Sequence, residues 1–419
     1  MKKLLLIGVL NVLLLFSPPP QPGTTDPNGR YVSLGHHAGF FLNPDTYGFI
    51  FPAIDPGLML ENRALRQSRP LFILMGSAIG YSIHLITWPL HNQLLRFYGK
   101  FWKGSYPRDK IVLLGNFYLG FFILNFFVLW IALFLFEKIF YELVEKTRVS
   151  EYSMYALMAF IASNPITKAF FWTVHQQMFS LMTPLLCIYL LFRYSKQINA
   201  PSIPRIGCLF FLAGSLMLIY GNFLMLYPLL IYSFLIRGSR PTVKDKNLFY
   251  LLKFVILTCL FLMPTLLWIT FLKSRGINYY SLEIEYYHQL VWIPESMGHS
   301  IRQFWTELVS NTLLFVHTLT TMAIFFIFSA IWVVVGGCRL NWGNRYLIIT
   351  LCLFCGFFIF YWLLGYYEER LTNSLIPIVI CFWVVVAGKK MGTRKFFYLS
   401  GSLAFTWQIY LMLSYGPFS

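Results

Sequence analysis

The run IVLLGNFYLGFFILNFFVLWIALFLF occupies residues 111–136, and it decides the fold class. It holds 26 residues and no charged side chain. A helix of about 20 apolar residues is long enough to cross the hydrocarbon core of a bilayer. Because similar runs recur along the whole chain, the sequence predicts an all-α, polytopic membrane protein without a separate soluble domain.

The composition of the 419-residue chain agrees with a membrane protein. Hydrophobic residues make up 58% of it and charged residues only 12%, which is too little charge for a soluble surface of this size. A formal net charge of +17 would suggest nucleic-acid binding in a soluble protein. Here most Lys and Arg residues lie in short clusters between apolar runs, as in membrane proteins oriented by positive charge. We therefore expect membrane lipids and no nucleic acid as partners.

Eleven apolar runs are expected to cross the membrane. The first, at residues 4–16, resembles a secretory signal, but no small-residue cleavage site precedes the prolines at 18–20, which favours a retained helix. The run at 70–95 carries polar side chains and breaks at Pro89, so we expect it to lie at the membrane surface. The other ten spans are expected near residues 111–136, 152–171, 178–192, 206–220, 223–236, 248–272, 307–336, 346–364, 372–388 and 396–413.

Positive charge predicts the orientation of these spans. With a cytoplasmic N-terminus, 18 of the 33 Lys and Arg residues fall in the short cytoplasmic segments 1–3, 137–151, 193–205, 237–246, 339–345 and 389–395. Most carboxylates then lie on the outer side. We therefore expect one transmembrane domain over residues 1–419, with a first extracytoplasmic loop at 18–110 that carries the interfacial helix and a second at 273–306.

Three arginines recur at a spacing of three in ENRALRQSRPLF, residues 61–72. A helical turn would place Arg63, Arg66 and Arg69 on one side, and the guanidinium fork matches phosphate oxygens. The triplet therefore predicts a phosphate-binding site. Contact with anionic lipid headgroups is an equally good interpretation of the spacing alone. Three carboxylates, Asp45, Asp55 and Glu61, precede the triplet in the same loop, and the surface helix begins at Pro70 directly after it, which favours the phosphate site.

Four short motifs lie where spans are expected to meet the outer face. RPLF (residues 69–72) leads from the long first loop into the surface helix, and SNP (163–165) ends a short span. HQQM (175–178) opens the next span, and GYYEERLTN (365–373) forms a late outer turn. This arrangement resembles the GT-C type of membrane glycosyltransferases. The likeness covers nearly the whole chain but supports the superfamily and no particular subfamily.

The resemblance implies transfer of a sugar from a polyprenyl phosphate-linked donor to an acceptor hydroxyl at the outer face of a bacterial inner membrane. The acceptor could be a glycan, a lipid or a protein. In such enzymes a carboxylate of the first outer loop takes the acceptor proton, which implies Asp26 here, with Asp45 as the nearest rival. Many relatives have an acidic pair at this position, whereas Pro27 follows Asp26, and DPNG (residues 26–29) is also a strong turn sequence. The arginine triplet would hold the donor phosphate.

Further polar residues on the outer side are candidates for contact with substrate or acceptor. Aromatic residues beside His288 could stack on a sugar ring, although an interfacial aromatic belt is the commoner explanation. An internal ion pair would equally satisfy the acidic and basic cluster at residues 368–370. With a first-loop carboxylate, that cluster could also ligate a divalent cation, Mg²⁺ or Mn²⁺, through oxygen atoms. The candidates are His175, Gln176, Glu283, His288, Glu368, Glu369 and Arg370.

Two other classes of function stay open. An O-antigen polymerase or ligase also has many spans and outer arginines, but its essential residues would concentrate in residues 273–305. A lipid-linked sugar transporter or flippase would need ionisable side chains in mid-span and broken helices in matching halves. The ionisable side chains that come nearest to this requirement are Lys253 and Glu307, and both lie near the ends of their spans rather than in the middle. No internal repeat is visible.

Overall fold

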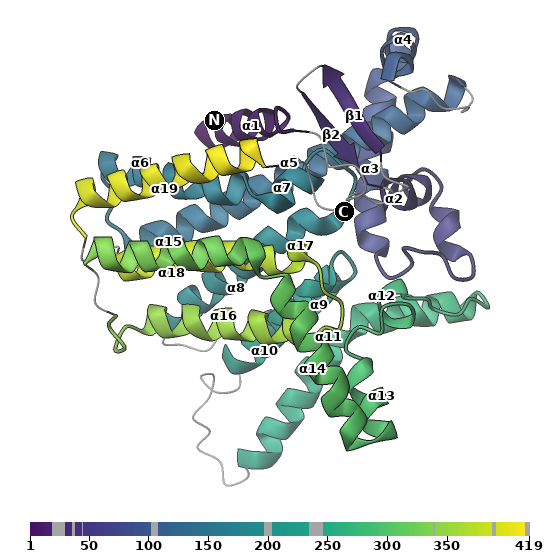
Figure 1. Cartoon of the computed structure of the whole chain (residues 1–419). Coiled ribbons are helices and arrows are strands. Elements are labelled where there is room, and N and C mark those ends of the chain that lie inside the picture. The colour runs from purple at the N-terminus through teal and green to yellow at the C-terminus, as the bar shows by residue number, and fades with distance from the viewer. Residues whose placement is uncertain are drawn as a thin grey trace.

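The computed structural model describes residues 1–18, 30–35, 38–43, 45–101, 108–196, 203–233, 246–337, 340–387 and 391–414. Within these ranges the chain is almost entirely helical (Figure 1). The exception is a two-stranded antiparallel hairpin of β1 (Arg30–Gly35) and β2 (Ala38–Leu42), which the sequence analysis did not predict.

The first half of the chain contains α1 (Lys2–Leu14), α2 (Asp45–Ile54), η1 (Pro56–Leu60), α3 (Pro70–Thr87), η2 (Trp88–Leu90), α4 (His91–Phe101), α5 (Arg108–Leu143), α6 (Arg148–Ala162), α7 (Pro165–Phe170), η3 (Gln176–Met178) and α8 (Phe179–Lys196). The second half contains α9 (Ile203–Met217), η4 (Gly221–Met225), α10 (Leu226–Ile231), α11 (Lys246–Ser274), α12 (Leu282–Glu285), α13 (Trp292–His299), α14 (Ile301–His317), α15 (Thr320–Gly336), α16 (Arg345–Leu363), α17 (Glu369–Thr372), η6 (Asn373–Leu375), α18 (Ile376–Ala387) and α19 (Thr393–Leu413).

Seven helices of the described residues are long and apolar enough to cross a membrane, or eight if one bent pair counts as a single span. This agrees with a polytopic membrane protein, while the expected count of eleven spans stays a prediction. The bent pair is α14 and α15, which meet at 65°. One of the seven is Pro70–Gly99, a segment that we expected to lie at the membrane surface. The expectation that this segment lies at the membrane surface rests on its polar side chains and on the charge pattern of the loops, and it also stays a prediction.

The core of the bundle lies around α5 and α18. The long helix α5 packs against α1, α3, α6 and α8, so it connects the N-terminal elements to the rest. All the side chains of α18 except Phe382 are buried, as expected for a helix that is apolar on every face. Trp383 stacks on Trp332 from α15 with ring centroids 5.3 Å apart. These contacts make α18 the central helix of the C-terminal half.

Three of the segments that we assigned to the cytoplasm, residues 1–3, 137–151 and the end of 339–345, meet at one end of the bundle. Lys2 forms an ion pair with Glu151 at 2.7 Å, and Lys3 forms one with Glu137. The hydroxyl of Tyr346, just after the loop at 339–345, donates to Glu142 at 3.1 Å. These three segments, which share a side in the charge pattern, therefore lie at one end of the structure, while the orientation in a membrane stays a prediction.

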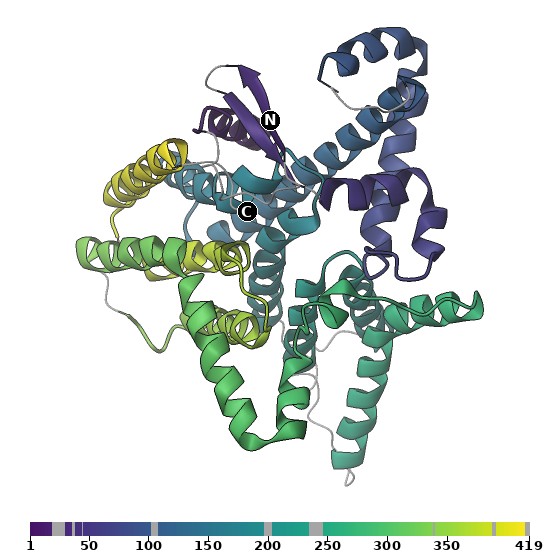
Figure 2. The same cartoon turned by 45° about the vertical axis from the view of Figure 1, so that its right-hand side comes forward.

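Apolar side chains cover the outer faces of the peripheral helices. On α11 and α14 they are largely exposed, including Leu266 and Leu267 on α11 and Val309 and Leu313 on α14. Both helices extend away from the main bundle (Figure 2). A soluble protein rarely exposes apolar patches of this extent. The exposed side chains of α11 and α14 are therefore of the kind expected where a helix contacts lipid tails.

Gly214 allows a close approach between α9 and α11. A Cβ atom at this position would meet the main-chain carbonyl of Phe261, which cannot move away as a flexible side chain could. We expect Gly214→Ala to separate the two helices and to lower the free energy of unfolding by about 1 to 3 kcal/mol.

The matched control for this prediction is Gly401→Ala on α19, where a Cβ would meet nothing within 4 Å. Alanine is the better helix former by roughly 0.5 to 1 kcal/mol, so this variant should keep or raise the stability. Thermal unfolding of both purified variants in the same detergent measures the difference. Equal melting temperatures for Gly214→Ala and Gly401→Ala would contradict the close approach of α9 and α11 at Gly214.

Candidate functional site

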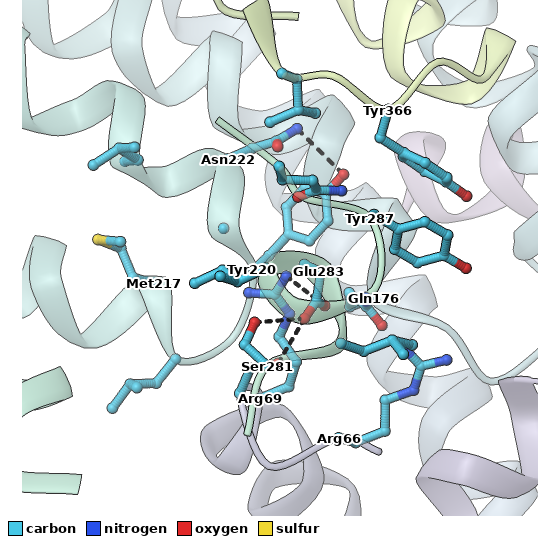
Figure 3. Close-up of a pocket in the computed structure, with 18 of the residues that line it drawn as sticks. Arg66, Arg69, Gln176, Met217, Tyr220, Asn222, Ser281, Glu283, Tyr287 and Tyr366 are labelled. Atoms are coloured by element: carbon cyan, nitrogen blue, oxygen red, sulfur yellow. Dashed lines mark hydrogen bonds and ion pairs between the residues drawn. The ribbon is translucent and has the colours of Figure 1, made fainter. Parts of the chain in front are cut away.

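A cavity of about 440 Å³ lies among the polar loops next to α12 and α17 (Figure 3). Segments from the whole length of the chain line it, from the start of α2 to residue 371. Most of the residues predicted for a site are brought together here, namely Asp45, Arg66, Arg69, His175, Gln176, Glu283 and Arg370.

Asp45 is the first residue of α2, and its carboxylate is held by two partners. Arg66 forms an ion pair with Oδ1, and Nε2 of His175 lies 3.3 Å from Oδ2. Burial alone would raise the pKa of the carboxyl. The hydrogen bond from His175 and the charge of Arg66 outweigh burial and hold the pKa of Asp45 well below its usual range. The side chain remains 35% exposed, so an ionised carboxylate is accessible from the cavity.

Arg66 and Arg69 belong to the short segment between η1 and α3. The guanidinium of Arg66 lies over the ring of Phe49, 4.7 Å from its centroid, which suits a weakly hydrated planar cation. Arg69 precedes Pro70, the first residue of α3, and its Nη2 donates to Glu283 at 2.9 Å. Both guanidinium groups therefore have fixed positions at the cavity wall.

His175, Gln176 and Gln177 follow each other at the break between α7 and α8. His175 is 3% exposed, and the main-chain N–H of Gln177 donates to its Nδ1 at 3.0 Å. Burial lowers the pKa of His175 to about 4, although Asp45 acts in the opposite direction. The imidazole is therefore neutral near pH 7. Gln176 is 5% exposed, and its Oε1 has no hydrogen-bond partner among the described residues.

Tyr220 and Asn222 also line the cavity, and the sequence analysis did not single them out. The Asn222 amide donates to the hydroxyls of Tyr220 at 3.2 Å and of Tyr361 at 2.8 Å. The Tyr220 hydroxyl in turn donates to Gln177 at 3.4 Å. The signal in the sequence is YGN (residues 220–222), which lies at the break between the spans expected at 206–220 and 223–236.

Residues 279–290, here called the covering segment, supply one wall of the cavity. Ser68 and Arg69 both donate to Glu283, at 3.0 and 2.9 Å, and so tie the segment to the first loop. On the other side the N–H of Leu290 donates to the carbonyl of Leu364 at 2.9 Å, and the Tyr287 ring lies against Tyr366. The covering segment thus connects two distant parts of the chain across the cavity.

Arg370 reaches the cavity from α17. Its Nη2 donates to the Tyr366 hydroxyl at 2.8 Å, and its Nε pairs with Glu368. Burial raises the pKa of Glu368 above its ordinary value despite the nearby charge of Arg370. The acidic partner of Arg370 therefore takes up a proton more easily than an exposed glutamate does.

Four of the predicted site residues that the structure describes do not line the cavity: Arg63, His288, Glu368 and Glu369. Of these, Glu368 is the ion-pair partner of Arg370. Arg63 is exposed, with a left-handed φ of 58°. His288 is also exposed and pairs with Glu295 at 3.1 Å. Glu369 accepts hydrogen bonds from Thr320 and Thr321 instead. Asp26 lies outside the described residues, so its role stays a prediction.

Metal-binding groups do not cluster in the part of the chain that the structure describes. No group there of three or more His, Cys, Asp or Glu side chains could hold a metal ion. The carboxylates of the cavity are instead paired with arginines: Asp45 with Arg66, and Glu283 with Arg69. The described residues therefore offer cations, rather than a ready set of acidic ligands, to a bound molecule.

The fold and the cavity together define a helical protein with membrane-type apolar helices and a charged site built from distant loops. Comparisons of the chain with protein-family models, with curated proteins and with solved structures found no match. The function therefore has to be argued from the residues of the site.

Replacing Glu283 with Gln is expected to loosen the covering segment, because Arg69 would keep a buried charge without its ionic partner. We expect a loss of about 1 to 3 kcal/mol of stability at pH 7 and faster proteolysis within the segment. The control is Glu285→Gln, an exposed residue of the same short helix. Similar melting temperatures and cleavage rates for the two variants would contradict the proposed attachment.

The same ion pair predicts an acid dependence of stability. Burial raises the pKa of Glu283, but the charges of Arg69 and Arg66 and the hydrogen bonds to the carboxylate together outweigh burial and lower the pKa from 4.5 to about 2 in the folded protein. The contribution of Glu283 is therefore complete above pH 4.5 and disappears as the pH falls toward 2. The difference in melting temperature between wild type and Glu283→Gln should narrow over this interval. A difference that does not change with pH would oppose this assignment.

Proposed function

We propose that this chain is a membrane glycosyltransferase that moves a sugar from a polyprenyl phosphate-linked donor to an acceptor hydroxyl. The observation that supports this most is the cavity itself. It gathers one accessible, ionised carboxylate, Asp45, and three guanidinium groups, those of Arg66, Arg69 and Arg370. A base and a phosphate-binding group are the two requirements of such a transfer.

In the proposed reaction the acceptor hydroxyl oxygen forms a bond to the anomeric carbon of the donor sugar. The bond from that carbon to the phosphate oxygen breaks, and its electron pair leaves with the lipid phosphate. The proton of the hydroxyl passes to Asp45. A carboxylate with a low pKa takes this proton only as the attacking oxygen becomes acidic in the transition state. We place Asp45 first as the base, because its side chain is 35% exposed, whereas that of Glu283, the other described carboxylate lining the cavity, is 17% exposed. Asp26 stays the alternative.

The arginines would stabilise the charge that develops on the departing phosphate. Their guanidinium groups are held in place beforehand by carboxylates and rings, so they need not reorganise during the reaction. Arg370 is the strongest candidate for contact with phosphate. Its partner Glu368 has a raised pKa, and protonation of Glu368 would leave the charge of Arg370 unbalanced.

The apolar side of the cavity would accept the start of the lipid chain. It is lined by Ile269 from α11 and by Phe360 and Leu364 from the end of α16. The same helix α11 carries exposed apolar residues along its length. An amphiphilic donor could therefore place its charged head among the arginines and its lipid tail along the exposed apolar side chains of α11.

We further propose that the protein lies in a bacterial inner membrane with its N-terminus in the cytoplasm and the cavity on the outer side. This rests on the positive charge of the short loops and on the contacts that join Lys2 and Lys3 to the loop at 137–151. The acceptor would be a glycan, a lipid or a protein. A divalent cation, Mg²⁺ or Mn²⁺, would reach the site together with the donor phosphate.

The second candidate is an O-antigen polymerase or ligase. It is favoured by the covering segment, because residues 279–290 belong to the late outer loop in which such enzymes would carry their essential residues. A lipid-linked sugar transporter or flippase would instead move its substrate without forming a glycosidic product. Sealed vesicles that accumulate a labelled lipid-linked sugar with no new product would favour transport.

Replacing Asp45 with Asn should reduce sugar transfer by about 100-fold or more, because the base is lost while the shape is kept. The assay follows label from a panel of polyprenyl phosphate-linked sugars in membranes that contain the protein. Asp26→Asn, tested in parallel, should retain transfer if Asp45 is the base.

The control variant is Asp55→Asn, in the same loop. Asp55 accepts a hydrogen bond from the Gly57 N–H at 2.9 Å and does not line the cavity, so this variant should remain active. Full activity of Asp45→Asn together with loss of activity in Asp26→Asn would move the role of base to Asp26. Loss of transfer only in variants of residues 273–305 would favour the polymerase or ligase.

A further inference from the structure

Both ring nitrogens of His175 are occupied by neighbouring groups. Nδ1 accepts a hydrogen bond from the main-chain N–H of Gln177 at 3.0 Å, and Nε2 lies 3.3 Å from Oδ2 of Asp45. Rings on two sides limit rotation of the imidazole. Phe49 meets it edge-on at 5.9 Å between centroids, and Phe170 lies at 4.7 Å.

The first of these contacts determines where the proton of the imidazole lies. A main-chain N–H can only donate, so Nδ1 must present its lone pair and cannot carry a proton. The neutral ring then carries its proton on Nε2, which donates to Asp45. Neither nitrogen is left to accept a proton from a molecule in the cavity.

We infer that His175 is a positioning residue that holds the Asp45 carboxylate in place through Nε2–H, and that it does not act as a base itself. This inference rests on the proposed function, in which Asp45 is the base. In a Ser-His-Asp triad a carboxylate orients a histidine that faces the substrate. Here the order is reversed, because a main-chain amide orients the histidine and the histidine orients the carboxylate.

The hydrogen bond from His175 has two consequences for Asp45. It fixes one carboxylate oxygen, so that the side chain has few orientations relative to the cavity. It also adds to the charges that keep the carboxyl ionised. The ionisable groups that act on this pair are Arg66 from the first loop, Arg370 from α17, Tyr287 from the covering segment and Glu368.

The tautomer can be read without any activity assay. The full-length protein, labelled with ¹⁵N-histidine in lipid bilayers, contains eight histidines, and subtracting the spectrum of His175→Gln isolates the signals of His175. We expect a neutral ring with its proton on Nε2 that does not titrate between about pH 8 and pH 5. A proton on Nδ1, or titration near the ordinary value of 6.5, would overturn the inference.

The role of the hydrogen bond is tested by two variants that differ in their ability to donate. His175→Phe keeps a ring between Phe49 and Phe170 but cannot donate, whereas His175→Gln keeps an N–H donor. We expect kcat to fall by about 10- to 100-fold in His175→Phe, with a smaller fall in His175→Gln and little change in KM. The acid limb of the pH–rate profile should move to higher pH in His175→Phe, because the pKa of Asp45 rises when a donor to its charged form is removed.

The two experiments separate this inference from the proposed function. An unchanged acid limb and unchanged kcat in a folded His175→Phe protein would overturn the positioning role. Conversely, full transfer activity in Asp45→Asn would contradict the proposed function, because Asp45 would not be the base, and His175 would then have no positioning role in the reaction. The predicted tautomer would in that case still describe a structural hydrogen bond, since it is measured without substrate.

Discussion

The ion pair between Asp45 and Arg66 is the interaction on which the rest of the site depends. Removing charged groups from water costs free energy, and the attraction between them offsets this cost only when the geometry is good and further contacts support the pair. His175 occupies the second carboxylate oxygen, and the Phe49 ring lies against the guanidinium. Asp45 begins α2, Arg66 precedes α3 and His175 precedes α8. One charged cluster therefore fixes three separate parts of the chain relative to each other.

The residue types of the site are predictable from the sequence, but their pairing is not. Ionisable residues are scarce in this chain, so those at the expected outer ends of apolar runs stand out as candidates. Nothing in the sequence indicates that Arg69 pairs with Glu283, 214 residues further along the chain. Nor does it indicate that Glu369 faces Thr320 while its neighbour Arg370 reaches the cavity. Such choices depend on which faces of distant helices meet, and hydropathy carries no information about this.

The helical, membrane-type architecture is likewise predictable, while the ends and bends of its helices are not. Residues 206–220 and 223–236 are both apolar enough to suggest spans. In the structure they give α9 of 15 residues and, after η4, α10 of 6 residues. Similarly, the run at 307–336 is one uninterrupted stretch in the sequence, yet it contains the 65° bend between α14 and α15. Apolar length measures what can be buried in lipid, and it does not report where the backbone changes direction.

Breaks in the helices explain how a polar site can exist within so apolar a chain. Backbone outside helices is tolerated at membrane depth only where it is buried in protein or lines a cavity. Between α7 and α8 the side-chain amide of Asn125 donates to three carbonyls, those of Phe170, Phe171 and Thr173, at 2.7 to 3.3 Å. A continuous helix would satisfy these groups itself, but it would turn successive side chains by about 100° away from one another. Because the helix is interrupted, the consecutive residues 175–177 can all reach the same cavity.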